Sequence, residues 1–369
     1  MRPAFGSVRQ AAAFAFLLLV ILLSPVLVGK SLLPSREQIY SSFWWANGAY
    51  PYIDEQIYRE KGDIDIAFIG ASHIWNGIDT PYVQNQLSQR LGRPATVRTF
   101  GWGGAGYDTL YLVTQDLLQH RKVHMIVYYD VYEVWDVPNG QAARLFRFAD
   151  DAHDLGGLPL LKKIDYYLAS ILGMPRNLLS MVRSNQPVDF SSRTKSLWET
   201  LKHADDIVER LGSLRTRNGY TATPTSSGTS FEEYAPLTTA TSSDVRIYSE
   251  ATKDDFYFTN DLPSWQLHFA RKFADLSRQY GCRIVLLHLP MFAERHDPKI
   301  GEKEFWPGAF GLNLDMVGIP SVKLFGNLTD EQIEKLYEDP GHFNENGQKY
   351  FTTLVTPALV ELYAAPNSH

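Results

Sequence analysis

The segment spanning residues 63–73 constrains the fold of this chain most. Its sequence, DIDIAFIGASH, first alternates acidic and apolar side chains and then runs apolar into Gly70. Such a run predicts a short, largely buried β-strand. Gly70 and Ala71 allow a sharp turn, so we expect Ser72 just past the carboxyl end of the strand, where open α/β sheets bind ligands. Ser72 is therefore a candidate nucleophile, although small residues also end many strands that have no catalytic role.

Strands and helices alternate on both sides of a long central segment. Strands are expected at 63–70, 95–100, 123–129, 283–289 and 321–324, and helices at 81–91, 108–120, 263–280 and 344–363. Thr80 and Pro81 are typical of a helix start, as N-cap and first helical residue. This alternation predicts an α/β fold with a parallel, doubly wound sheet.

The alternation stops between residues 137 and 260, which we interpret as an insertion in a single domain that spans residues 63–369. Its amphipathic stretches at 158–172 and 195–211 predict helices, and its Ser/Thr-rich tract at 221–243 predicts a loop. Insertions of this kind shape a substrate cleft or a partner surface, and the sequence leaves open which of the two applies.

The N-terminus predicts where the protein works. Residues 11–29 are uncharged and mostly apolar, and Arg2 and Arg9 precede them. The run is long enough to span a bilayer, and the two arginines favour the cytoplasmic side. We expect residues 1–30 to form a single-pass anchor in the inner membrane, with the rest of the chain on the periplasmic or extracellular side. A cleaved signal peptide is the alternative.

Residues 31–62 connect this anchor to the domain. They are aromatic and polar, which suits a linker that packs back on the body or an interfacial belt near the membrane.

Composition narrows the choice of partners. The formal net charge is −6, and no basic stripe is present, which argues against nucleic acid as a partner. The single cysteine, Cys282, cannot form an internal disulfide, and no metal-ligand spacing surrounds it. We expect a buried, inert thiol, and we expect neither a metal nor a cofactor.

Two further motifs carry chemistry. Residues 101–106, GWGGAG, follow a predicted strand and suit close approach of backbone N–H groups to a ligand, or simply a tight connection.

Asp339 stands three residues before His342, with Pro340 and Gly341 between them, so both side chains can project toward one site. Serine catalysis needs such a base and a carboxylate to orient it. Alone, Asp339 equally suits a turn or a helix start.

Together these segments resemble the SGNH/GDSL hydrolase superfamily over residues 63–129 and 283–363. The resemblance implies a three-layer, flavodoxin-like fold around a central parallel sheet. It also implies that Ser72 is the nucleophile, His342 the base and Asp339 the orienting acid. The backbone N–H groups of Ser72 and Gly104 would form the oxyanion hole, with Gly103 as the alternative to Gly104.

One block departs from the family pattern, which has an asparagine in a Gly-x-Asn-Asp block after the third strand. Here residues 130–133 read DVYE, without that oxyanion donor. Loss of one donor typically costs about a hundred- to a thousandfold in rate. With the predicted anchor, the chain resembles the membrane-anchored branch that includes proteins of alginate and cellulose O-acetylation and of teichoic-acid D-alanylation.

This branch implies an exported Ser-His-Asp acyl-transfer enzyme that acts on ester groups of an envelope or extracellular polysaccharide. It would work as an O-acetyltransferase or an acetylesterase, beside a membrane-bound O-acyltransferase. The alternative is a catalytically weak glycan-binding or scaffold subunit of a polysaccharide synthesis complex. The missing asparagine favours that alternative, and Trp75 and Trp102 suit either sugar stacking or the core. The sequence leaves the acyl group and the acceptor open.

Overall fold

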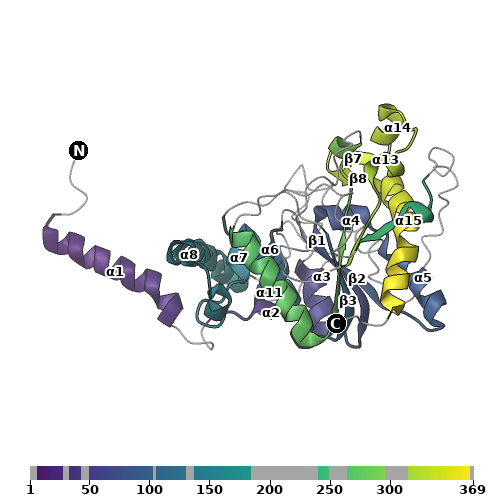
Figure 1. Cartoon of the computed structure of the whole chain (residues 1–369). Helices are drawn as coiled ribbons and strands as arrows, with labels where there is room; N and C mark the ends of the chain where they lie inside the picture. The colour runs from purple at the N-terminus through teal and green to yellow at the C-terminus, as the bar shows by residue number, and fades with distance from the viewer. Residues whose placement is uncertain are drawn as a thin grey trace.

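The structure is a computed structural model that describes residues 6–27, 33–42, 50–102, 105–129, 137–183, 240–248, 264–295 and 315–365. A six-stranded sheet forms its centre (Figure 1). The strands are β1 (Ile64–Ala71), β2 (Val97–Trp102), β3 (Val123–Tyr129), β4 (Arg246–Tyr248), β5 (Arg283–Leu287) and β6 (Asp315–Gly318).

The strand order is β2-β1-β3-β5-β6-β4. All neighbouring pairs are parallel except β4 and β6, which are antiparallel at one edge. Taken alone, the five parallel strands follow the flavodoxin-like order 2-1-3-4-5. In this order the direction in which successive strands are added to the sheet reverses between β1 and β3. The predicted parallel, doubly wound sheet is therefore confirmed.

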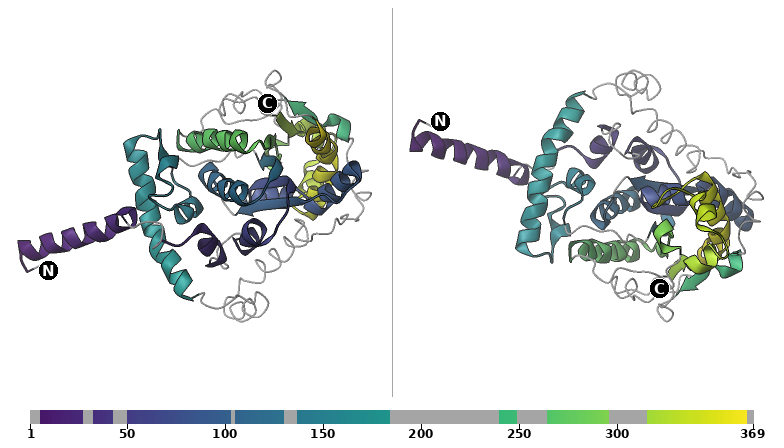
Figure 2. Two further views of the ribbon diagram at one scale, coloured as in Figure 1. Left: turned by 90° about the horizontal axis from the view of Figure 1, so that it is seen from below. Right: turned by 90° about the horizontal axis from the view of Figure 1, so that it is seen from above.

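Helices cover both faces of the sheet, giving three layers (Figures 1 and 2). One layer contains α5 (Thr80–Leu91) and α15 (Glu345–Ala364), which pack against each other. The other contains α6 (Tyr107–His120) and α11 (Ser264–Tyr280), which also pack together. Strand β1 is buried along its whole length, as its apolar run predicts, so its carboxyl end is held firmly between β2 and β3.

The described part of the linker packs back on the body. It forms α2 (Arg36–Ser42), α3 (Tyr50–Asp54) and a π-helical turn, η1 (Glu55–Arg59). The apolar side chains Ile39, Tyr40, Ile53 and Ile57 lie in the core.

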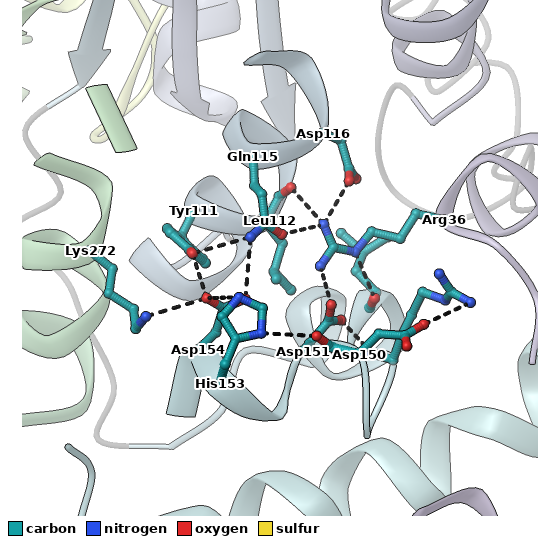
Figure 3. Close-up of polar contacts among 12 residues, drawn as sticks. Arg36, Tyr111, Leu112, Gln115, Asp116, Asp150, Asp151, His153, Asp154 and Lys272 are labelled. Atoms are coloured by element: carbon teal, nitrogen blue, oxygen red, sulfur yellow. Dashed lines mark hydrogen bonds and ion pairs between the residues drawn. The ribbon is translucent and has the colours of Figure 1, made fainter. Parts of the chain in front are cut away.

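A buried ion-pair network fixes the start of this linker (Figure 3). The Arg36 guanidinium lies 2.6 Å from a carboxylate oxygen of Asp116 on α6 and 2.8 Å from one of Asp151. Because all three side chains are buried, replacing Arg36 would leave both carboxylates in the interior without their ion-pair partner. Arg36 therefore holds α2 to the domain.

Some sequence-based boundaries were wrong. The strand expected at 321–324 is a short helix, α13 (Ser321–Leu324), and strand β6 lies just before it. Four residues of alternating polarity do not distinguish a strand from a helical turn, and Pro320 begins the turn. The N-cap of α5 is Asp79 rather than Thr80, because the Asp79 carboxylate accepts a hydrogen bond from the Tyr82 N–H.

The central segment also differs from expectation. Strand β4 lies within it, where no strand was predicted, and it joins the sheet edge through β6. The helix expected at 158–172 is the longer α8 (Leu160–Arg183). The helix expected at 195–211 and most of the tract at 221–243 lie outside the described residues.

The N-terminal segment forms helix α1 (Val8–Leu27), which projects away from the body (Figure 1). It covers most of the expected anchor at 11–29, and residues 28–29 lie outside the described range. Within the described ranges, no helix combines the length and apolar character needed to cross a membrane.

Candidate active site

Ser72 stands at the carboxyl end of β1, as predicted, and is the first residue of helix α4 (Ser72–Gly77). Gly70 permits this placement, because a β-carbon there would lie 2.9 Å from the Tyr129 β-carbon and 3.1 Å from that of Ile74. The first amides of a helix have no acceptor within the helix. The Ser72 N–H therefore suits an oxyanion.

His342 reaches Ser72 from a point 270 residues later in the chain: its Nε2 lies 2.8 Å from the Ser72 Oγ. It belongs to β8 (His342–Phe343), which pairs with β7 (Tyr337–Asp339) in a small hairpin. Phe343 is buried in this hairpin, and Gly347 has no room for a β-carbon because the Leu336 carbonyl occupies that space. Tight packing of the hairpin on α15 thus positions His342.

Asp339 completes the constellation. Both of its carboxylate oxygens lie 2.9 Å from the Nδ1 of His342, and its Oδ1 also accepts the backbone N–H groups of Gly341 and His342. Burial by itself raises the pKa of Asp339, but the hydrogen bonds from Gly341 and His342 outweigh it and lower the pKa below its ordinary value. Asp339 is therefore ionised at neutral pH.

This arrangement selects the tautomer of His342. A carboxylate only accepts hydrogen bonds, so Nδ1 carries the proton and Nε2 presents its lone pair to the Ser72 hydroxyl. That is the state in which an imidazole takes a proton from serine. The other interpretation of Asp339, as a helix start, is wrong: the N-cap of α15 is Asn344, which accepts hydrogen bonds from the N–H groups of Asn346 and Gly347.

His73 is a site residue whose role the sequence did not indicate. Its ring stacks on His342, with centroids 4.4 Å apart and planes 19° apart, and on Tyr129, with values of 4.9 Å and 14°. Burial, and then the neighbouring charge of His342, lower the pKa of His73 to about 4, against a smaller opposing effect of Asp339. His73 is therefore neutral at neutral pH. Its position directly after Ser72 is the signal that the sequence offers.

The glycine-rich segment is described only at its two ends. Gly103 and Gly104 lie outside the described residues, so the oxyanion role of Gly104 stays a prediction, as does the effect of residues 130–133. At the first end, a β-carbon on Gly101 would clash with the Trp75 indole. The half-buried Trp75 thus forms a wall at the end of β2.

The second end of this segment is braced by α11. The Gln266 side-chain oxygen accepts the Tyr107 N–H at 2.7 Å. The buried Asp108 carboxylate accepts the Asn139 N–H and the Trp265 indole N–H, and burial raises its pKa to about 6. These contacts hold the chain that leaves the predicted oxyanion loop, and nothing in the sequence marked them.

The predicted burial of Cys282 is confirmed. Its side chain is 5% exposed, and burial raises the pKa of its thiol to about 12. A protonated, buried thiol is a poor nucleophile.

Comparisons with known protein families and curated proteins found no match, so the assignment of the site rests on its geometry.

Proposed function

We propose that this protein is a serine acyl-transfer enzyme of the SGNH type. The observation that carries the proposal is the hydrogen-bonded series Asp339–His342–Ser72 at the carboxyl end of β1. The parallel strand order and the position of the serine after the first strand also support it, since ligands of such sheets bind at this edge.

The geometry supports a two-step reaction. In the first step, the Ser72 Oγ attacks the carbonyl carbon of an ester while its proton moves to the Nε2 of His342. Asp339 stabilises the resulting imidazolium, and the Ser72 N–H binds the oxyanion. The bond to the alcohol then breaks, and the alcohol leaves with the proton from His342.

In the second step, water or a sugar hydroxyl attacks the acyl-serine. His342 takes the proton of the attacking group and returns a proton to the Ser72 Oγ as the new acid or ester departs. Attack by water makes the protein an esterase, and attack by a hydroxyl makes it a transferase.

The substrate proposal follows from the resemblance. We place the enzyme at a cell membrane with its catalytic domain outside the cytoplasm, acting on acetyl or related esters of an envelope or extracellular polysaccharide. A membrane-bound O-acyltransferase is its proposed partner. The second candidate is a catalytically weak glycan-binding subunit, which the absence of asparagine from residues 130–133 favours.

Labelling with a fluorophosphonate tests the enzyme proposal, because this reagent reacts with activated serines. The wild-type protein should be labelled, Ser72→Ala should not, and Ser243→Ala, which changes an exposed serine, should be labelled like the wild type. A wild-type protein that folds but takes up no label would overturn the enzyme and leave the glycan-binding subunit.

A further inference from the structure

Helix α8 presents a stripe of large apolar side chains to solvent. Leu160 and Leu161 are 72% and 75% exposed, and Ile164 and Leu168 are 43% and 48% exposed. Their spacing of one, four and eight residues puts all four on one face of the helix. Solvent-exposed apolar residues gathered in this way are typical of an interaction surface.

The opposite face of α8 fixes its orientation. Tyr166 and Ser170 are buried there, and the Tyr166 ring packs 4.7 Å from the rings of both Phe146 and Trp265. Because these contacts hold α8 against the body, the stripe faces outward.

The stripe adjoins a second exposed apolar surface. Helix α1, on which Phe16 and Leu17 are 68% and 57% exposed, ends beside α8, and α8 runs across that end (Figures 1 and 2). Helix α2, which follows α1 in the chain, packs against α8. Arg36 at the start of α2 pairs with Asp151, just ahead of α8. The two apolar surfaces therefore belong to the same end of the molecule.

The charges beside the stripe indicate what covers it. Lys162 and Lys163 follow its first two leucines and are partly exposed, and the exposed Asp165 stands four residues after Leu161 on the same helix. Long basic side chains beside an apolar face suit a lipid surface, where the alkyl stem lies along the acyl chains and the ammonium reaches the headgroups. We propose that α8 lies flat in the headgroup region of a lipid bilayer, with Leu160, Leu161, Ile164 and Leu168 in the acyl boundary.

This inference goes beyond the proposed acyl transfer and does not depend on it. It has one consequence for the catalytic site. Helix α4 and the β7–β8 hairpin lie in the half of the body away from α8 (Figure 1). Ser72 would then face the aqueous phase, where a polymer substrate approaches.

Site-directed fluorescence on the full-length protein tests the proposal. Leu161→Cys and Leu168→Cys are each labelled with an environment-sensitive nitrobenzoxadiazole dye and reconstituted in phosphatidylcholine–phosphatidylglycerol vesicles. Val322→Cys is the matched control, since Val322 is 51% exposed on α13, far from α8. The buried Cys282 should take up little dye, which mock labelling of the wild type checks.

Both α8 labels should shift to shorter emission wavelengths in vesicles, and doxyl-labelled lipids should quench them at least about twofold more than the Val322 label. Equal quenching at α8 and at Val322, or none, would overturn the proposal. A blue shift without lipid quenching, together with a dimer by light scattering, would also overturn it and assign the stripe to a second copy. Melting temperatures near that of the wild type confirm that the variants are folded.

Discussion

The His73 imidazole lies face to face with the imidazole of His342, with ring centroids 4.4 Å apart. Tyr129, at the end of β3, also stacks on His73. The proposed base thus rests on a stack of rings that extends into the sheet. Such a platform restrains rotation of His342, and because His73 is neutral, it adds no repelling charge when His342 takes up the serine proton.

Replacing the platform should therefore impair turnover. His73→Ala removes the stack and is expected to lower kcat for p-nitrophenyl acetate at least about tenfold with little change in KM, since misplaced catalytic groups cost rate. His73→Phe keeps a flat ring and should stay near the wild-type kcat. Equal losses in the two variants would mean that the imidazole itself, rather than its flat face, is needed.

His73 should also make stability depend on pH. Its pKa is about 4 when folded, against an ordinary value of 6.5. As the pH falls below 6.5, His73 takes up a proton in the unfolded chain, whereas in the folded protein it stays neutral until about pH 4. The stability of the folded state therefore decreases as the pH is lowered from 6.5 to about 4. The difference corresponds to about 3 kcal/mol. Urea unfolding at several pH values should show that the free energy of unfolding decreases less at acid pH in His73→Phe than in the wild type. The same pH dependence in both proteins would contradict this.

The proposed catalytic residues should act as one unit. Ser72→Ala and His342→Ala should each lose most activity toward p-nitrophenyl acetate, and the double variant should be scarcely worse than either, because each depends on the other. Steady-state kinetics on all three proteins provides the check. Full activity in Ser72→Ala would remove Ser72 from the mechanism, and additive losses would argue against the hydrogen-bonded pair.

Asp339→Asn tests the third member. The change removes the negative charge that stabilises a protonated His342 and allows the wrong tautomer, which in a serine protease costs about ten thousandfold in turnover. Because the Asp339 side chain is 51% exposed, we expect a smaller loss here, of at least about tenfold, with an unchanged melting temperature.

Asn344→Ala is its matched control. It removes the true cap of α15, so it should cost about 1 kcal/mol of stability. Activity measured well below the melting temperature should remain high. Wild-type activity in Asp339→Asn would reduce the site to a Ser72–His342 pair.

The proposed location is tested by a C-terminal alkaline phosphatase fusion of the full chain. This enzyme is active only outside the cytoplasm, so the fusion should be active and should fractionate with membranes. An inactive fusion would contradict export. An active but soluble protein that starts near Ser31 would indicate the cleaved signal peptide.

Local patterns were enough for much of the fold. The apolar run of β1 is long and bounded by Gly70, so its position was clear from the residues alone. Short elements were missed or misassigned because a few residues cannot define a period. β4 is three residues long and pairs with β6 at the sheet edge, and the alternating polarity of the four-residue α13 suits a strand as well as a helical turn.

For the site, the sequence by itself determined which residue types stand at the strand end and at the Asp339–His342 turn. Those features depend on neighbours within a few residues. Only the tertiary structure decided that His342 meets Ser72 and that His73 stacks on both Tyr129 and His342. These relations join segments up to 270 residues apart, and packing of the hairpin on α15 and of β1 beside β3 creates them. Such contacts arise from burial in three dimensions, which no local spacing encodes.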